Sequence, residues 1–153
     1  MEKPNGTKIV VLGGLGEVGK NMYCVMHNDA IVIIDTGVSF PESELMGVDY
    51  VLPDFTFLKK NENKIKALLI THGHEDHIGG IPFLLQSLNI PAIYAPNHAK
   101  ELIAVKLQDK NIRYDNLFVY TEDTKLKFKE IEIEFFRVTH SIPDSHCLLY
   151  TSD

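Results

Sequence analysis

The sequence Thr71-His72-Gly73-His74-Glu75-Asp76-His77 decides the fold of this chain. It follows an apolar segment at residues 66–70 that predicts a buried strand, and it precedes a segment with apolar residues at helical spacing, namely Ile81, Leu84, Leu85 and Leu88. The predicted order is therefore strand, polar loop, helix. Such a loop at the end of a strand is a common position for functional side chains.

Four potential metal ligands lie within this loop: His72, His74, Asp76 and His77. Alternate side chains of an extended chain point the same way, so His72 and His74 can hold one metal ion. Imidazole and carboxylate groups together suit zinc. A structural zinc would more often recruit cysteine, and neither cysteine is near, so the pattern favours a catalytic zinc over a structural one or over a solvated polar loop.

The composition predicts one globular domain, because 153 residues with 44% hydrophobic side chains can form their own core. No apolar run approaches the roughly 20 residues of a membrane span, and no secretory signal is evident, so we expect a cytoplasmic protein without membrane contact. The net charge of -6 argues against a DNA-coating surface. RNA stays open, because bound cations reverse the local potential. Cys24 and Cys147 lack CxxC spacing, which predicts free thiols.

Apolar runs and alternation predict strands and helices in mixed order, which is typical of an α/β layered domain. The expected strands cover residues 7–12, 22–27, 30–35, 66–70, 92–95, 117–120, 125–128 and 131–138. Short helices are expected at 55–60 and after residue 80, and a longer one from an N-cap at Asn97 to about residue 108. Phe136 and Val138 leave the alternation of the last strand, which predicts a β-bulge.

The glycine loop at residues 13–19 matches two nucleotide-binding motifs formally. Asp35 stands where a Rossmann fingerprint places its acidic residue, but the hairpin expected between them leaves no room for the helix that this fingerprint needs. A P-loop would carry Ser or Thr where Asn21 stands. We therefore expect the glycines to provide a tight backbone path, one that lets the loop pass close to the metal site.

The motif His-x-His-x-Asp-His after an apolar strand resembles the signature of the metallo-β-lactamase fold superfamily. Five segments narrow the resemblance to the bacterial ribonuclease J family: residues 13–21, 40–42, 47–50, 71–80 and 139–145. The similarity spans about Val10 to Ser145. It implies the first part of an αββα sandwich, so we expect residues 1–145 to be the N-terminal part of such a domain.

The resemblance implies that His72, His74 and His140 hold a first metal ion and that Asp76 and His77 hold a second. His140 on its own, after a strand, is more often a local hydrogen-bonding residue, and only the segment Thr139-His140-Ser141-Ile142-Pro143-Asp144-Ser145 favours a ligand. Asp76 and His77 are the expected catalytic residues, and Asp76 is expected to orient the attacking hydroxide or take its proton. No residue is expected to bind a nucleotide cofactor.

Three further features follow from the resemblance. Asp35 is expected to orient the ligand loop without contacting metal, although from sequence alone an ordinary turn carboxylate is as good a description. The backbone carbonyls of Met46 and Val48 are expected to hold a structural calcium ion. The family implies zinc, with manganese as another metal, an RNA substrate cut by endonuclease and 5′-3′ exonuclease action in RNA maturation and decay, and a homo-oligomer in the full-length protein.

After Ser145 the sequence departs from the family pattern, so we expect residues 146–153 to be a foreign tail. The family continues with a bridging aspartate, a nucleotide-gripping β-CASP domain and a further histidine beyond Asp153. With two ligands for the second ion, we expect one weakly held zinc and little or no nuclease activity from this chain alone. Two alternatives stay open: a related hydrolase of small esters or thioesters, and a non-catalytic metal-binding or assembly module.

Overall fold

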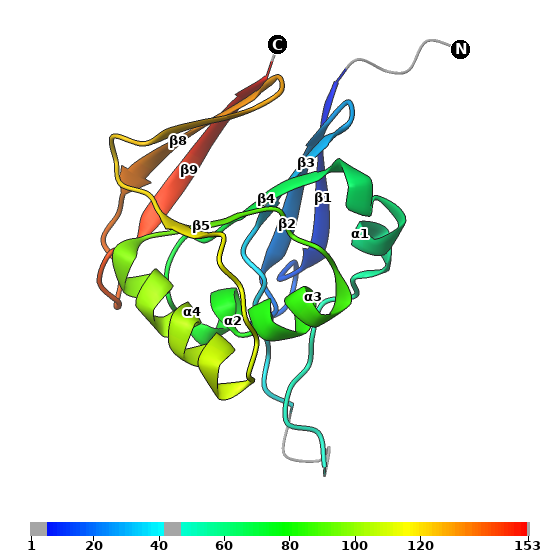
Figure 1. The fold of residues 1–153 in the computed structure, drawn as a ribbon, viewed down its shortest axis with the longest axis vertical. Helices are drawn as coiled ribbons and strands as arrows, with labels where there is room; N and C mark the ends of the chain where they lie inside the picture. The colour runs from blue at the N-terminus through cyan, green and yellow to red at the C-terminus, as the bar shows by residue number, and fades with distance from the viewer. Residues whose placement is uncertain (1–5, 42–46, 153) are drawn as a thin grey trace.

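A computed structural model describes residues 6–41 and 47–152, which form two packed β-sheets with helices on one side (Figure 1). The strands are β1 Thr7–Gly13, β2 Met22–His27, β3 Ala30–Ile34, β4 Ile65–Leu69, β5 Ile93–Ala95, β6 Leu117–Val119, β7 Lys125–Phe128, β8 Ile131–Arg137 and β9 His146–Ser152. The α-helices are α1 Thr56–Lys60, α2 Glu75–Ile78, α3 Ile81–Ser87 and α4 Asn97–Asp109, and a 3₁₀ turn covers Glu62–Lys64.

The first sheet has six strands in the sequential order β1 to β6. β1, β2 and β3 are antiparallel neighbours, whereas β3, β4, β5 and β6 run parallel. The predicted hairpin is confirmed, with Asn28 at its turn in the left-handed region at a φ of 49°. Because the loops after β3 and β4 leave the same edge of the sheet, Asp35 and the histidine loop lie side by side.

The second sheet consists of β7, β8 and β9, all antiparallel, and it packs on the face of the first sheet that α3 and α4 leave open. This layering, helices then sheet then sheet, confirms the metallo-β-lactamase type of architecture expected from the sequence. The segment expected to be a foreign tail provides β9, which pairs with β8 along its whole length in unbroken register. Its side chains Leu148 and Tyr150 pack against the core between the sheets.

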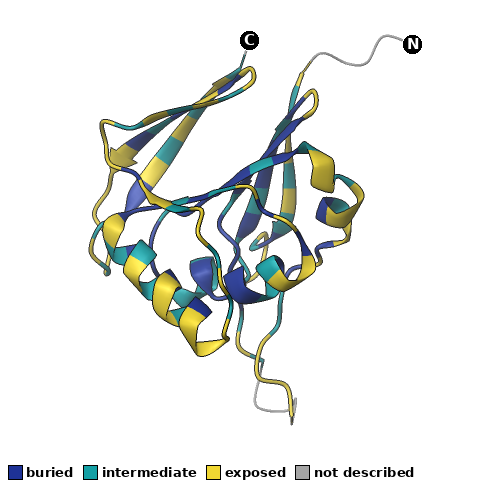
Figure 2. Cartoon of the chain, viewed as in Figure 1, coloured by how far each residue is buried: buried dark blue, intermediate teal, exposed yellow. Residues whose placement is uncertain are grey.

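Two apolar cores flank the first sheet, and β4 contributes to both (Figure 2). On one side Leu68 and Ile70 pack with helix residues such as Leu84 and Ile103. On the other side Ala67 and Leu69 pack with the second sheet. A strand buried on both faces is a continuous apolar run, which explains why the segment before the histidines has no alternation.

Two local predictions are wrong. Asn97 is the first residue of α4 rather than its N-cap; Pro96 is the cap, with an extended backbone and no side-chain bond, and its carbonyl accepts the Lys100 N–H. No bulge interrupts β8, because its pairing with β9 continues one to one as far as Arg137. Phe136 and Val138 are simply outward-facing and exposed, so the change of apolar phase needs no change of register.

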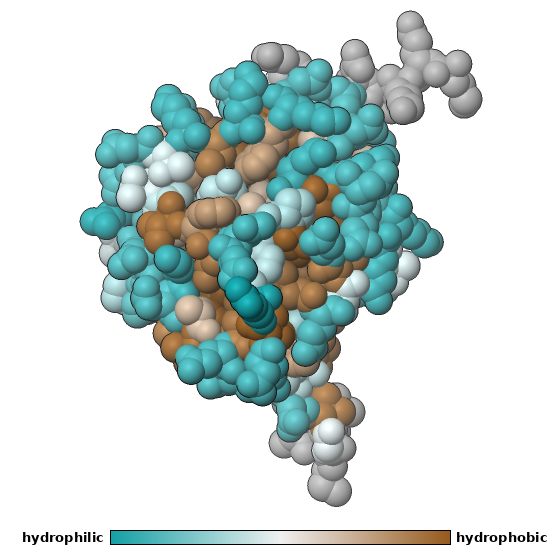
Figure 3. Space-filling view, viewed as in Figure 1, coloured by the Kyte–Doolittle hydropathy of each residue, from teal (hydrophilic) through white to brown (hydrophobic). Residues whose placement is uncertain are grey.

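Within the described ranges, no helix has the length and apolar character needed to cross a bilayer. Figure 3 nevertheless shows hydrophobic residues exposed among the mostly hydrophilic residues of the surface. Exposed apolar side chains also occur on the edge strand β6, at Phe118 and Val119, and on the outer face of the second sheet, at Phe136 and Leu149. The two thiols are free, as predicted; Cys24 is buried and Cys147 exposed.

Tyr120 connects the core between the two sheets to Ile70, the residue before the ligand loop, and its replacement by Phe tests this connection. Its ring stacks on Phe135 at 3.6 Å between centroids, and its buried hydroxyl donates to the Ile70 carbonyl at 2.6 Å. Tyr120→Phe leaves that carbonyl unpaired, so we expect a loss of about 1–2 kcal/mol in the free energy of unfolding, measured by urea denaturation. Tyr50→Phe, at an exposed ring, is the control and should change it by less than about 0.5 kcal/mol.

Candidate metal centre

Three histidines from two distant segments meet at the edge of the first sheet. His72 and His74 lie in the loop after β4, and His140 lies in the exposed loop between β8 and β9. One ring nitrogen from each lies within 4.8 Å of the others. The three rings pack edge to face, with centroid separations of 4.8 to 4.9 Å. The structure therefore brings together the three residues expected to hold the first ion.

The spacing of the ring nitrogens suits a shared tetrahedral ion. His72 Nε2 lies 3.1 Å from His74 Nδ1. Two nitrogens at the ordinary zinc–nitrogen distance and tetrahedral angle would be about 3.3 Å apart. Three such ligands leave one position open, which is the arrangement of a catalytic rather than a structural zinc. The spacing of His72 and His74 thus fits a divalent cation, and the ring nitrogen of His140 lies within 4.8 Å of theirs.

A chain of hydrogen bonds fixes which nitrogen of His72 carries its proton. The Thr71 hydroxyl lies 2.8 Å from Asp35 Oδ2, which can only accept, so the hydroxyl proton is donated there. The hydroxyl oxygen then accepts from His72 Nδ1 at 2.8 Å. The lone pair of His72 is left on Nε2, the atom that faces the other histidines.

Burial keeps that lone pair free of protons. Desolvation lowers the pKa of His72 to about 4, and repulsion from His77, His74 and His140 acts in the same direction. A metal ligand must be a neutral imidazole, so at neutral pH His72 is already in its binding form.

Asp76 and His77 form a second pair of ligand atoms beside the first cluster. Asp76 Oδ2 lies 3.5 Å from His77 Nε2, and the His77 ring lies 4.0 Å from that of His72. His77 Nδ1 donates to Asp35 Oδ2 at 2.7 Å, which leaves the lone pair on Nε2. Burial opposes protonation of His77, but its hydrogen bond to Asp35 and the charges of Asp35 and Asp76 prevail and raise its pKa. The pair is adjacent to the three histidines but offers only two ligands.

Asp35 acts on both groups without joining either. Its carboxylate is 3% exposed and accepts the Thr71 N–H at 2.8 Å as well as the Thr71 hydroxyl and the His77 ring. The residue directly follows β3 and adopts the left-handed region at a φ of 58°, which aspartate tolerates better than most residues. Its three hydrogen bonds join the ligand loop and the His77 ring to the end of β3.

A hollow of about 440 Å³ opens beside these residues, between the ends of the two sheets. His72, His77 and His140 contribute to its wall, and the start of β9 completes it with Cys147 and Leu148. A substrate could therefore approach the histidines along a mainly apolar surface.

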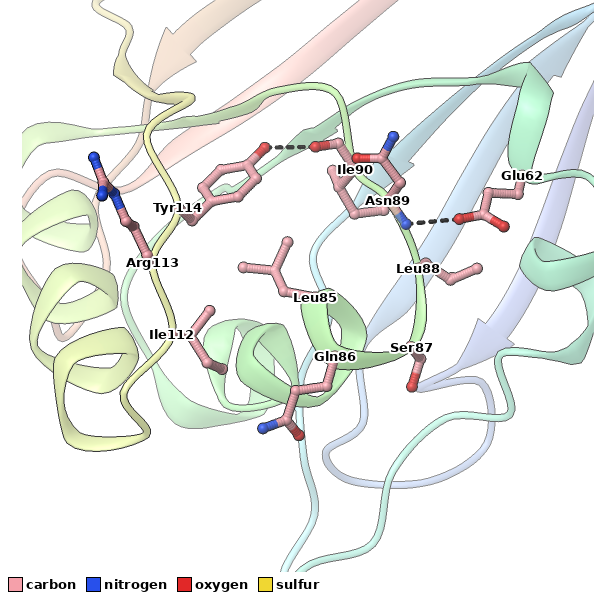
Figure 4. A pocket seen from close by; sticks show the side chains of 10 residues that line it. All are labelled: Glu62, Leu85, Gln86, Ser87, Leu88, Asn89, Ile90, Ile112, Arg113 and Tyr114. Atoms are coloured by element: carbon pink, nitrogen blue, oxygen red, sulfur yellow. Dashed lines mark hydrogen bonds between the residues drawn. The ribbon is translucent and has the colours of Figure 1, made fainter.

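Another hollow, of about 400 Å³, lies between the end of α3 with the residues that follow it and residues 112–114 before β6 (Figure 4). Its polar groups already bond each other: the Tyr114 hydroxyl donates to the Ile90 carbonyl, and the Asn89 N–H donates to Glu62. No histidine lines it, so the ligand cluster stands at a different place in the fold.

Two further histidines and one serine make local contacts outside the cluster. His27 is buried and bonds Thr7, and His146 is buried with its ring nitrogen 3.1 Å from the Asp144 carbonyl. Ser145 donates to the Ile142 carbonyl. Of the two residues expected to hold calcium, Met46 lies outside the described residues and Val48 is exposed.

Two contributors to the site escaped the sequence reasoning. Thr71 relays between Asp35 and His72, and the Asn21 amide contacts both Asp76 and His77. Asn21 is the residue that a P-loop would have as Ser or Thr, so its position after the glycine loop was the available signal. No nucleotide-binding helix follows that loop, because residues 22–27 form β2, an antiparallel partner of β1. The loop instead approaches the metal centre, as expected.

A family profile described as "Metallo-beta-lactamase superfamily" matches residues 15–153. The chain is 49% identical to Ribonuclease J 1 of Streptococcus pyogenes over 143 residues, which is 93% of this chain and 25% of that protein. It is 47% identical to Ribonuclease J of Mycoplasma pneumoniae over 140 residues, which is 91% of this chain and 25% of that protein. The chain thus spans about a quarter of the length of these curated relatives.

The fold has solved counterparts at low sequence identity. The metallo-beta-lactamase fold protein YhfI from Bacillus subtilis superposes with a TM-score of 0.61 at 18% identity, covering 95% of this chain and 58% of that one. At this identity the likeness concerns the fold. The family profile extends through the segment after Ser145, of which residues 146–152 form β9.

Removal of the Asp35 carboxylate should destabilise the metal-free protein strongly. Asp35→Ala leaves the Thr71 N–H and the His77 ring nitrogen without their acceptor in a buried position, so we expect a loss of about 3–5 kcal/mol in the free energy of unfolding. Asp54→Ala is the matched control, because Asp54 also accepts from a threonine N–H and hydroxyl but at an exposed helix start. Equal losses in the two variants would contradict this role of Asp35.

The lowered pKa of His72 predicts a pH dependence of stability in the presence of a chelator. Between pH 6.5 and about 4 the unfolded chain binds a proton that folded His72 does not, so stability should fall as the pH falls through this window. The contribution of His72 should reach about 3 kcal/mol at the acid end. His72→Gln should flatten the dependence in urea titrations at several pH values, and an unchanged slope would refute the assignment.

Proposed function

Because the chain belongs to the metallo-beta-lactamase superfamily, we propose that it is the metal-binding part of a ribonuclease that hydrolyses RNA phosphodiester bonds. The observation that carries the proposal is the convergence of His72, His74 and His140 beside the pair Asp76 and His77. RNA is the proposed substrate because the relatives at 49% and 47% identity are named Ribonuclease J. The proposal includes endonuclease and 5′-3′ exonuclease action. It also includes a cytoplasmic location and a homo-oligomer in the longer protein.

His72, His74 and His140 would hold the first divalent cation, with zinc or manganese as the proposed metals. Asp76 and His77 would hold the second. When bound, two neighbouring cations supply the positive charge that stabilises a phosphoryl group under attack and lowers the pKa of water. The protein's own side chains would accept the proton and orient the ligands.

Asp76 is the proposed proton acceptor. Its carboxylate is 40% exposed, in contrast to the enclosed carboxylate of Asp35, so water and substrate can reach it. The neighbouring Glu75 does not compete for this role, because its carboxylate pairs with Lys106 of α4. Asp35 and Thr71 hold the two histidine rings in the required tautomers.

The cation requirement gives a first test. We expect the chelator-treated chain to bind one zinc ion at the three histidines, and His140→Ala to weaken this binding at least tenfold, because one of three ligands is lost. Isothermal calorimetry measures the affinity. His98→Ala removes a histidine outside the cluster and should leave it unchanged. Equal affinities in the wild-type and His140→Ala chains would refute the shared site.

The substrate class gives a second test. A 5′-labelled single-stranded RNA, a p-nitrophenyl ester and a thioester are offered to the zinc- or manganese-loaded chain. With only two ligands for the second ion we expect slow RNA cleavage, lost on Asp76→Asn and on chelation, and no turnover of the other two. Turnover of the ester or thioester alone would identify a small-molecule hydrolase. Metal binding without any turnover would support a metal-binding or assembly module.

A further inference from the structure

We infer that Asn21 is a positioning residue that holds Asp76 and His77 in the geometry of a cation-binding pair before any cation arrives. The inference rests on the proposed function, since it assigns a role within the second cation position. It also explains the glycine loop, which the proposed chemistry does not otherwise use.

The Asn21 side-chain amide contacts each ligand atom of the pair. Its Nδ2 donates to Asp76 Oδ2 at 3.1 Å and to the Asp76 carbonyl at 3.1 Å, and it lies 3.3 Å from His77 Nε2. In the neutral form of His77, whose Nδ1 donates its proton to Asp35, Nε2 carries the lone pair and accepts from the amide. The two amide hydrogens are thus shared among the two atoms that would bind the cation and the Asp76 carbonyl.

Backbone contacts hold Asn21 in this position. Its N–H donates to the Asp76 carbonyl at 3.1 Å, and its own carbonyl accepts the Gly37 N–H at 3.0 Å. Gly37 is needed at this crossing, since a Cβ there would lie 1.6 Å from the Asp76 carbonyl oxygen. The two loops after β1 and β3 are therefore fastened to the ligand loop by main-chain bonds that survive any change of the Asn21 side chain.

The glycine loop leaves room for the amide. Gly14 has a φ of +87°, and a Cβ at this residue would lie 2.5 Å from Asn21 Oδ1. A Cβ at Gly13 would lie 2.1 Å from the Lys20 carbonyl oxygen. These two glycines permit the tight return that places Asn21 over Asp76, which is a structural requirement for them independent of nucleotide binding.

Asn21 matters because Asp76 is otherwise loosely held. The carboxylate is 40% exposed, and its two described polar contacts are with Asn21 and His77. Without the Asn21 amide, the Asp76 carboxylate would be free to turn toward solvent and away from His77. A cation takes over the single lone pair of His77 Nε2, whereas the carboxylate keeps further lone pairs for the amide. Asn21 can therefore retain its bond to Asp76 after the cation binds.

The metal-free protein tests the positioning directly. In the chelator-treated chain, NMR should show the Asn21 side-chain NH₂ hydrogens exchanging with water about fivefold to tenfold more slowly than those of the exposed Asn89, in line with one or two hydrogen bonds. Asp76→Ala should reduce this protection, because it removes the carboxylate acceptor and leaves only the Asp76 carbonyl and His77 Nε2 as partners of the amide. Unprotected Asn21 hydrogens in the wild-type chain would overturn the inference without touching the proposed function.

Zinc titration tests the consequence. By calorimetry we expect Asn21→Ala to weaken binding of the second zinc ion about tenfold relative to wild type and to leave binding of the first unchanged. The described contacts of the Asn21 amide are with Asp76 and His77 and not with the three histidines. Asn61→Ala is the matched control; its half-buried amide donates to the Phe57 carbonyl far from the site, and both affinities should stay unchanged.

Three results would contradict the inference: unchanged affinities in Asn21→Ala, an equal loss at both positions together with a lower melting temperature, or tighter binding of the second ion. The last would show that the amide only competes with the cation. If the wild-type chain takes up no second zinc ion even at millimolar concentration, the two-cation proposal fails, and the exchange of the Asn21 hydrogens still decides whether Asn21 holds the pair.

Discussion

The buried carboxylate of Asp35 is the constraint on which the rest of the centre depends. A negative charge in the protein interior is tolerated only where donors surround it, and here the Thr71 N–H, the Thr71 hydroxyl and the His77 ring provide them. These hydrogen bonds also orient the two histidine rings of the site. The Thr71 pair fixes the His72 ring, and the His77 bond directs its free nitrogen outward. The same hydrogen bonds thus solvate the Asp35 carboxylate and orient the imidazole rings of His72 and His77.

The position of that carboxylate follows from the sheet. β3 and β4 are parallel neighbours, so the residues that follow them, Asp35 and Thr71, leave the same edge. The Asp35 N–H donates to the Leu69 carbonyl, which extends the ladder to the last residue before the loops diverge. Rigid strands buried on both faces therefore set the geometry of the loops, and the exposed loop that carries His140 is the least constrained part of the cluster.

The sequence was sufficient for the parts of the structure that depend on local pattern. The apolar run of β4, the hairpin of β2 and β3, and the paired spacing of His72 and His74 each carry their own signal. His140 does not, because one histidine after a strand is common, and only the resemblance of its neighbours pointed to it. Asn21 and Tyr120 act across segments distant in sequence, through contacts that no spacing encodes. The bulge was predicted wrongly because outward apolar side chains on β8 imitate a shift of register.

The loop of His140 has a consequence for folding. It connects two strands of the second sheet, whereas His72 and His74 follow a strand of the first. The chain between His74 and His140 contains α2, α3, α4 and four strands. An ion shared by the three histidines would act as a cross-link that closes this long loop. The free energy of ion binding would oppose the gain in chain entropy that accompanies separation of the two sheets. Tighter metal binding would therefore also hold the two sheets together more strongly.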